Sequence, residues 1–249
     1  MNAEERTPQS WYAIVEAYQA SLRSYLDHYG GMEDPKLEAM PSEGENYAKL
    51  SSSLFTGQSV EDVKIEAHRL VQIITGAAKI KQAPGNLILR SVVAVYADGE
   101  TKRFRHGRIH VSSRGYYTFK DGTTIKDTFE KSVVLFSLRC RGTHPQVDEV
   151  LCSFAQSDDW AGLYRILETI GRDLNENDAE KKTHARDKIK QRKWASISEI
   201  SSFYRTADSY RHNRPKPNPR TMLLDDAQNL IGRIVEAWLR EVARRLTPP

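Results

Sequence analysis

The spacing of apolar residues in the first third of the chain predicts helices. Between residues 11 and 26 apolar side chains recur every three or four positions, as on one face of an amphipathic helix, and Gly30 and Gly31 follow as an end signal. Residues 35–44 indicate a loop. Ser59, with Asp62 three positions later, predicts the cap of a second helix that ends before Gly76.

After Pro84 the pattern changes to one that predicts strands. Residues 86–96 are rich in β-branched and apolar types, residues 103–112 alternate, residues 116–120 follow, and residues 133–138 form a continuous apolar run. Asp-Gly pairs at positions 98–99 and 121–122 are typical of tight turns between strands. Together these signals predict an antiparallel meander of four or five strands.

The last third again has helical spacing. We expect a short helix over residues 145–154, a second with Ser157 as its cap, a third opened by a capping box of Ser196 and Glu199, and a fourth over residues 223–242. The charged stretch 176–193 indicates a solvated helix or a loop. Prolines make residues 213–220 an extended loop.

The sequence therefore predicts an α+β fold with N-terminal helices, a central antiparallel β-meander and a C-terminal helical bundle. The expected division is an N-terminal helical segment over residues 1–83, a sheet over residues 84–142 and a helical domain over residues 143–249. No internal repeat of solenoid length interrupts this order.

Composition and charge narrow the class of protein. Hydrophobic residues make up 39% of the 249 and charged residues 28%, which is typical of a globular chain. There is no apolar run of about 18–20 residues and no secretory leader, so we expect a cytoplasmic protein without a membrane partner. The net charge is −6 over residues 1–78, +6 over 79–150 and +4 over 151–249, which permits binding to a polyanion and equally permits the thirds to dock on each other.

Several motifs of common enzymes are missing from the sequence. It has no phosphate loop, no dinucleotide-binding glycine turn, no His-Glu-x-x-His zinc helix and no Gly-x-Ser-x-Gly elbow. His106 and His110 lie four positions apart in a predicted strand, which separates them by about 13 Å, too far to share one ion. We therefore expect neither a metal site nor a cofactor.

A run of aromatic and basic residues over positions 102–120 has two interpretations. Exposed rings beside cations are typical of surfaces that bind single-stranded nucleic acid. Strand alternation alone would place the rings in the core and the charges in water.

The densest group of polar side chains spans residues 203–214, at the end of a predicted helix and before the proline loop. Arg205 and His212 are seven positions apart, about 10 Å along a helix axis and on one face. A histidine exchanges protons near neutral pH, and a guanidinium binds phosphate and stabilises charge that develops on it. The structural alternative is that Arg211 and His212 stabilise a helix C-terminus while Asp208 pairs with a neighbouring arginine.

Arg205, followed by His212 after six intervening residues, resembles the Arg-x(4–6)-His signature of HEPN-fold proteins, which are helical RNases and RNA-binding modules of bacterial toxin and phage-defence systems. The resemblance covers the C-terminal third. It implies a helical bundle, often dimeric, in which Arg205 and His212 meet in an RNA cleft. Separately, the run from Trp160 through Tyr210 to Asp226 and Ala227 is similar to a group of bacterial proteins, a likeness that implies no activity.

The resulting hypothesis is a metal-independent RNA-cleaving or RNA-binding protein of a defence or toxin system. Its catalytic residues are His212 and Arg205, its phosphate-binding residues Arg211 and Arg214, and its orienting residues Asp208 and Tyr204. The alternative is a non-catalytic binding module or a structural subunit. The expected partners are RNA, a partner protein or a second copy of the chain.

Overall fold

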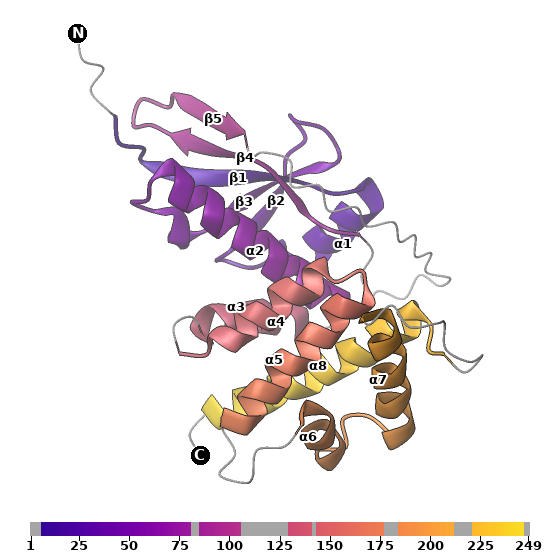
Figure 1. The fold of residues 1–249 in the computed structure, drawn as a ribbon. Coiled ribbons are helices and arrows are strands. Elements are labelled where there is room, and N and C mark those ends of the chain that lie inside the picture. The colour runs from indigo at the N-terminus through magenta and orange to yellow at the C-terminus, as the bar shows by residue number, and fades with distance from the viewer. Residues whose placement is uncertain are drawn as a thin grey trace. The chain divides into compact units, whose positions relative to one another are not determined.

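The structure of this protein is a computed structural model that describes residues 6–80, 85–105, 129–140, 143–176, 184–211 and 221–246. In these ranges the chain is an α+β protein with eight α-helices and one five-stranded antiparallel sheet (Figure 1). It divides into two compact units, and two of the boundaries fall inside helices, between Thr75 and Gly76 and between Ser132 and Val133.

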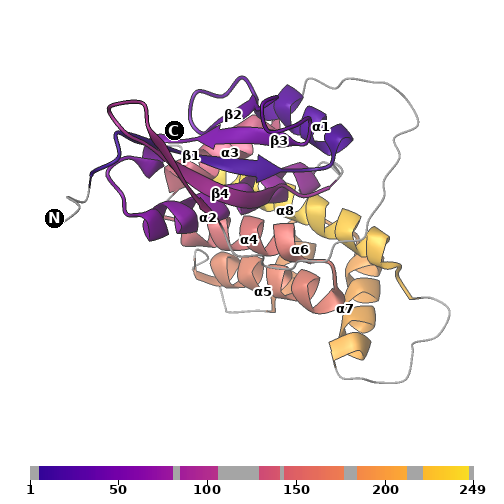
Figure 2. The same cartoon turned by 90° about the horizontal axis from the view of Figure 1, so that it is seen from above.

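The first unit holds the sheet, in the order β2-β3-β1-β4-β5 (Figure 2). Its elements are β1 (Ser10–Glu16), α1 (Gln19–Tyr29), β2 (Lys36–Ala39), β3 (Tyr47–Ser51), the short 3-10 helix η1 (Ser53–Phe55), α2 (Val60–Ile80), β4 (Ile88–Val95) and β5 (Thr101–Arg105). Strands β1, β2 and β3 from residues 1–83 and strands β4 and β5 from residues 84–142 therefore belong to one sheet.

The prediction of a helix from residue 11 is wrong, because the chain forms β1 before α1 begins. Trp11, Ala13 and Val15 are buried on one face of β1, and Ile14 is buried on the other. A central strand that is buried on both faces lacks clean alternation, and its apolar residues also fit helical spacing. Two further strands, β2 and β3, occupy parts of the chain for which we expected a loop or made no prediction.

The β4–β5 hairpin is confirmed, and it shows where the first ring of the aromatic run points. Its turn contains Asp98 and Gly99, the latter with a φ of 82°. Phe104 pairs with Val92, and its half-buried ring lies 5.9 Å from that of Trp11. The Lys102 ammonium lies 5.3 Å from the centroid of the same ring, so Phe104 has a core neighbour and a cation beside it and decides for neither interpretation. Positions 106–120 lie outside the described residues.

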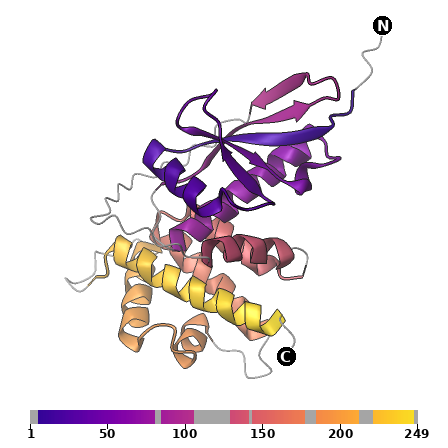
Figure 3. The same ribbon diagram turned by 180° about the vertical axis from the view of Figure 1, so that it is seen from behind.

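The second unit is a bundle of helices that also includes the last part of α2, from Gly76 onward (Figure 3). Its helices are α3 (Phe129–Cys140), of which Val133 onward belongs here, α4 (Pro145–Gln156), α5 (Trp160–Glu176), α6 (Ala185–Gln191), α7 (Ile197–Arg211) and α8 (Leu224–Leu246). The central helix is α5, which contacts α4, α6, α7 and α8.

The prediction of a strand over residues 133–138 is wrong, because these residues form the middle of α3. Val133, Val134, Ser137 and Cys140 are buried, which is the spacing of one helix face. A short apolar run carries no periodicity that separates a buried strand from a buried helix.

Two predicted helix ends also differ from the structure. Gly76 lies inside α2, where a Cβ atom would come within 2.2 Å of the carbonyl oxygen of Leu151, so only glycine allows this approach. Ser157 ends α4, with its hydroxyl donating to the carbonyl of Ser153. The start of α5 is instead capped by Asp159, whose carboxylate accepts from the amide of Gly162 at 2.7 Å.

Among the helices of the described ranges, none has the length and apolar character needed to cross a membrane.

Candidate functional site

The helix that carries the predicted site is fixed at its start by the predicted capping box. The amide of Ser196 donates to the Glu199 carboxylate at 2.9 Å, and the amide of Glu199 donates to the Ser196 hydroxyl at 3.2 Å. The Ser196 hydroxyl and the Arg233 guanidinium also donate to Glu199, and these hydrogen bonds lower its pKa to about 2. The carboxylate therefore stays ionised at neutral pH.

The structure describes only part of the predicted site. Tyr204, Arg205 and Asp208 lie on α7, and Arg211 is the last residue of that helix. The side chain of Arg211 and the whole of His212 and Arg214 lie outside the described part of the chain.

Arg205 is exposed on α7 and makes no ion pair or hydrogen bond to any residue in the described ranges. No hydrogen bond joins it to Asp208 or Tyr204 within those ranges, although Asp208 has an interaction of its own. Within the described ranges, the donors of this guanidinium are therefore unused, and such a group can bind an external anion.

Tyr204 packs between helices instead of facing Arg205. Its ring meets that of Tyr164 on α5 edge to face, with centroids 5.4 Å apart and an interplanar angle of 79°. Burial raises the pKa of the Tyr204 hydroxyl well above its ordinary value, so the group stays protonated at neutral pH. The contact of Tyr204 with Tyr164 therefore positions α7 against α5.

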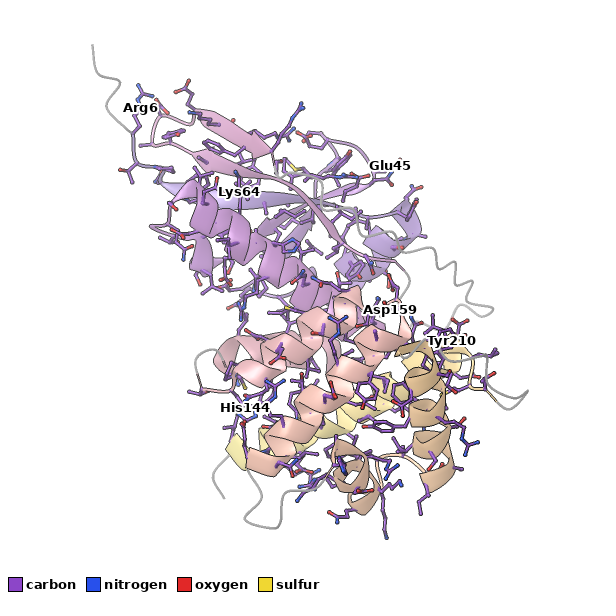
Figure 4. The ribbon with its side chains drawn as sticks, in the orientation of Figure 1. Arg6, Glu45, Lys64, His144, Asp159 and Tyr210 are labelled. Atoms are coloured by element: carbon purple, nitrogen blue, oxygen red, sulfur yellow. The ribbon has the colours of Figure 1, made fainter. Side chains whose placement is uncertain are left out.

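A stack of three aromatic rings ends in an exposed tyrosine beside the predicted site. Trp160 lies between Phe203, at 5.7 Å, and Tyr210, at 5.6 Å with an interplanar angle of 8°. Tyr210 is 55% exposed, and it lies at the end of α7 (Figure 4). We assigned no role to Tyr210 from sequence, although its seven-residue spacing from Phe203 places both rings on one helix face.

A pocket of about 460 Å³ lies between α7 and the start of α8. Met222, beside it, is held to α7 by a 3.3 Å hydrogen bond from its amide to the Thr206 hydroxyl. Arg233 lies 2.5 Å from Glu199 across the pocket. The lining comes from both helices and the residues before α8: Glu199, Ser202, Thr221, Met222, Asp226, Asn229, Leu230 and Arg233.

A second polar cluster, which the sequence did not indicate, is buried inside the bundle. Asp173 on α5 is fully buried and accepts hydrogen bonds from the Trp238 indole at 2.7 Å and from Arg245 at 2.6 Å. Nε2 of His144 lies 2.9 Å from the other carboxylate oxygen of Asp173, but without hydrogen-bond geometry (Figure 4 labels His144). The cluster connects α5 to α8, with the Asp173 carboxylate fully buried and the Arg245 side chain 26% exposed.

Within the described ranges, no group of three or more His, Cys, Asp or Glu side chains is arranged to hold a metal ion. No protein-family model, curated protein or solved structure matches this chain.

Proposed function

We propose that this protein binds RNA at the C-terminal end of α7 and cleaves it without a metal ion. The observation that supports this proposal is the exposed guanidinium of Arg205, which lacks a partner among the described residues. A guanidinium presents five N–H donors in a planar fork that matches the oxygens of a phosphate, so an exposed arginine can bind one.

The aromatic stack supports RNA as the anion. More than half of the Tyr210 side chain is accessible, and its ring is fixed parallel to Trp160 at 5.6 Å. A ring held in this way provides a flat surface on which an unpaired base can stack. Single-stranded RNA is therefore a better ligand for this end of α7 than a duplex.

The proposed reaction is transesterification within the RNA strand. His212 accepts the proton of the 2′-hydroxyl, whose oxygen forms a bond to the adjacent phosphorus. The bond from that phosphorus to the 5′-oxygen breaks, which leaves a 2′,3′-cyclic phosphate and a 5′-hydroxyl. The 5′-oxygen takes its proton from water, and the hydroxide so formed removes the proton that His212 accepted, which regenerates water and the neutral imidazole. Arg205 stabilises the added negative charge on the phosphoryl oxygens, with Arg211 and Arg214 binding the flanking phosphates.

In this proposal the biological setting is a cytoplasmic defence or toxin system, and a second copy of the chain is a candidate to complete the cleft. Non-catalytic RNA binding is the alternative, for which the stacked Tyr210 would suffice.

The test is RNA cleavage by the purified full-length chain in EDTA, followed on a labelled single strand. We expect His212→Ala to abolish cleavage and Arg205→Ala to reduce kcat/KM by at least about a hundredfold, the usual effect of removing one group that stabilises transition-state charge. Arg244→Ala is the matched control, because Arg244 is an exposed arginine in the last turn of α8.

Two outcomes would contradict the enzyme. Wild-type chain that leaves RNA intact in EDTA removes the cleavage step. RNA affinity that falls with salt and is unchanged in His212→Ala, without cleavage, would assign the same surface to binding alone.

A further inference from the structure

The pocket between α7 and α8 is not used by the proposed reaction. Its two carboxylates differ in how many hydrogen bonds they already accept. Glu199 is satisfied by Ser196 and Arg233. Asp226 is exposed and has neither a hydrogen bond nor an ion pair to any residue in the described ranges. Among the described residues, the pocket therefore offers one carboxylate, that of Asp226, whose acceptor sites are unused.

The opposite end of the pocket offers donors. Arg233 uses Nη2 to reach Glu199, and a guanidinium carries five N–H groups, so four remain. Asp226 and Arg233 are seven residues apart on one face of α8, about 10 Å along its axis, with Asn229 between them. The hydrogen-bond acceptors of Asp226 thus lie at one end of the pocket and the donors of Arg233 at the other.

Guanine presents the complementary arrangement. Its Watson–Crick edge places two adjacent donors, N1–H and the N2 amino group, where a carboxylate can accept both. Its O6 and N7 are the acceptor pair that arginine contacts most often in nucleic acids. Adenine has a donor at position 6 and no second donor beside it, so it cannot satisfy both ends of this pocket.

The remaining walls suit the faces of a purine. Met222 and Leu230 contribute apolar surface, and a thioether makes favourable contacts with aromatic rings. The volume of about 460 Å³ lies within the range of pockets that hold small ligands.

We propose that this pocket binds a guanine base, with Asp226 accepting from N1–H and N2 and with Arg233 donating to O6 and N7. That the base belongs to RNA rests on the proposed function. Met222 is hydrogen-bonded to Thr206, the residue after Arg205, so the guanine pocket and the phosphate-binding arginine are positioned by adjacent residues of α7. The site would select RNA that carries an unpaired guanine.

The test measures binding of free guanosine, adenosine, cytidine and uridine to the full-length chain by calorimetry. We expect saturable binding of guanosine, at least tenfold tighter than that of the other nucleosides. Asp226→Asn should weaken guanosine binding at least tenfold, because the amide group presents donors where guanine needs an acceptor. Asp225→Asn is the matched control: it is an exposed aspartate in the same first turn of α8 and does not line the pocket.

Three results would overturn the guanine site: no saturable guanosine binding, equal affinity for adenosine, or equal affinities of the Asp226→Asn and Asp225→Asn variants. This failure is distinct from failure of the proposed function. RNA cleavage in EDTA without guanosine binding removes the pocket and leaves the enzyme, whereas guanosine binding by a chain that neither binds nor cleaves RNA removes the enzyme and leaves the pocket.

Discussion

At the scale of single residues, the bundle depends on a buried carboxylate. Removing Asp173 from water carries a penalty, and the hydrogen bonds from Trp238 and Arg245 offset it. A buried ion pair of this kind adds little net stability compared with apolar residues, but the loss of one partner leaves the other uncompensated.

We therefore expect Asp173→Asn to lower the free energy of unfolding by about 3 kcal/mol, since Arg245 would lose its counter-charge. Urea denaturation followed by tryptophan fluorescence measures this change. Arg172→Gln is the control, because its pair with Glu149 is half exposed at 3.6 Å and exposed pairs contribute at most about 1 kcal/mol. Equal losses of unfolding free energy in the two variants would mean that the hydrogen bonds of Asp173 do not stabilise the packing of α5 against α8.

Residue-scale features were predictable only where they are local. The positions of Tyr204, Arg205 and Asp208 on one helix follow from spacing, as does the capping box at Ser196. Asp173 meets partners 65 and 72 positions away, and no periodicity in the sequence joins such distant residues. The pocket was missed for the same reason, since α7 and α8 meet only after the chain has folded.

At the scale of elements, helices with strong periodicity were predicted correctly, as α4, α5, α7 and α8 show, although the predicted cap of α5 at Ser157 was wrong. The errors at residues 11–16 and 133–138 both concern short apolar runs, in which the side-chain pattern does not distinguish a strand from a helix. Tertiary packing decides such segments.

The close approach of α2 to α4 gives a prediction at this scale. Gly76→Ala places a Cβ 2.2 Å from the backbone of Leu151, so we expect a loss of about 1–3 kcal/mol despite the higher helix propensity of alanine. Gly232→Ala in α8 is the matched control: its nearest neighbours would lie at 3.5 Å and beyond, and we expect unchanged or higher stability. Thermal melting of the two variants compares them, and a Gly76→Ala chain as stable as Gly232→Ala would contradict this contact.

At the scale of the whole molecule, neither compact unit is a continuous piece of sequence. The first resumes after α2 with the β4–β5 hairpin, and the second includes residues 76–82 as well as residues 133 onward. Periodicity divides a chain into consecutive segments, so sequence patterns did not indicate this interleaving. The α+β class was nevertheless correct, because it depends only on which elements are present.

A fragment of residues 133–249 should therefore be less stable than the same unit in the full chain. The fragment lacks Gly76, which packs against the backbone of Leu151. It also lacks Lys79, whose ammonium donates to the carbonyl of Ala155 at 2.8 Å and to Asp158 at 3.0 Å. We expect the fragment to melt at least about 4 °C lower, which corresponds to about 1 kcal/mol. Joining residues 60–82, which include the whole of α2, to the fragment through a flexible linker should restore the melting temperature. A fragment 133–249 that melts like the full chain would contradict the assignment of residues 76–82 to the second unit.

The place of β1 in the middle of the sheet has a consequence for synthesis on the ribosome. This first strand pairs with β3 on one side, and its other edge stays open until β4 has been translated more than seventy residues later. An unpaired apolar edge can join a neighbouring nascent chain. Slow translation between residues 51 and 88 should therefore lower the yield of native protein, and chaperones that cover extended apolar segments should raise it.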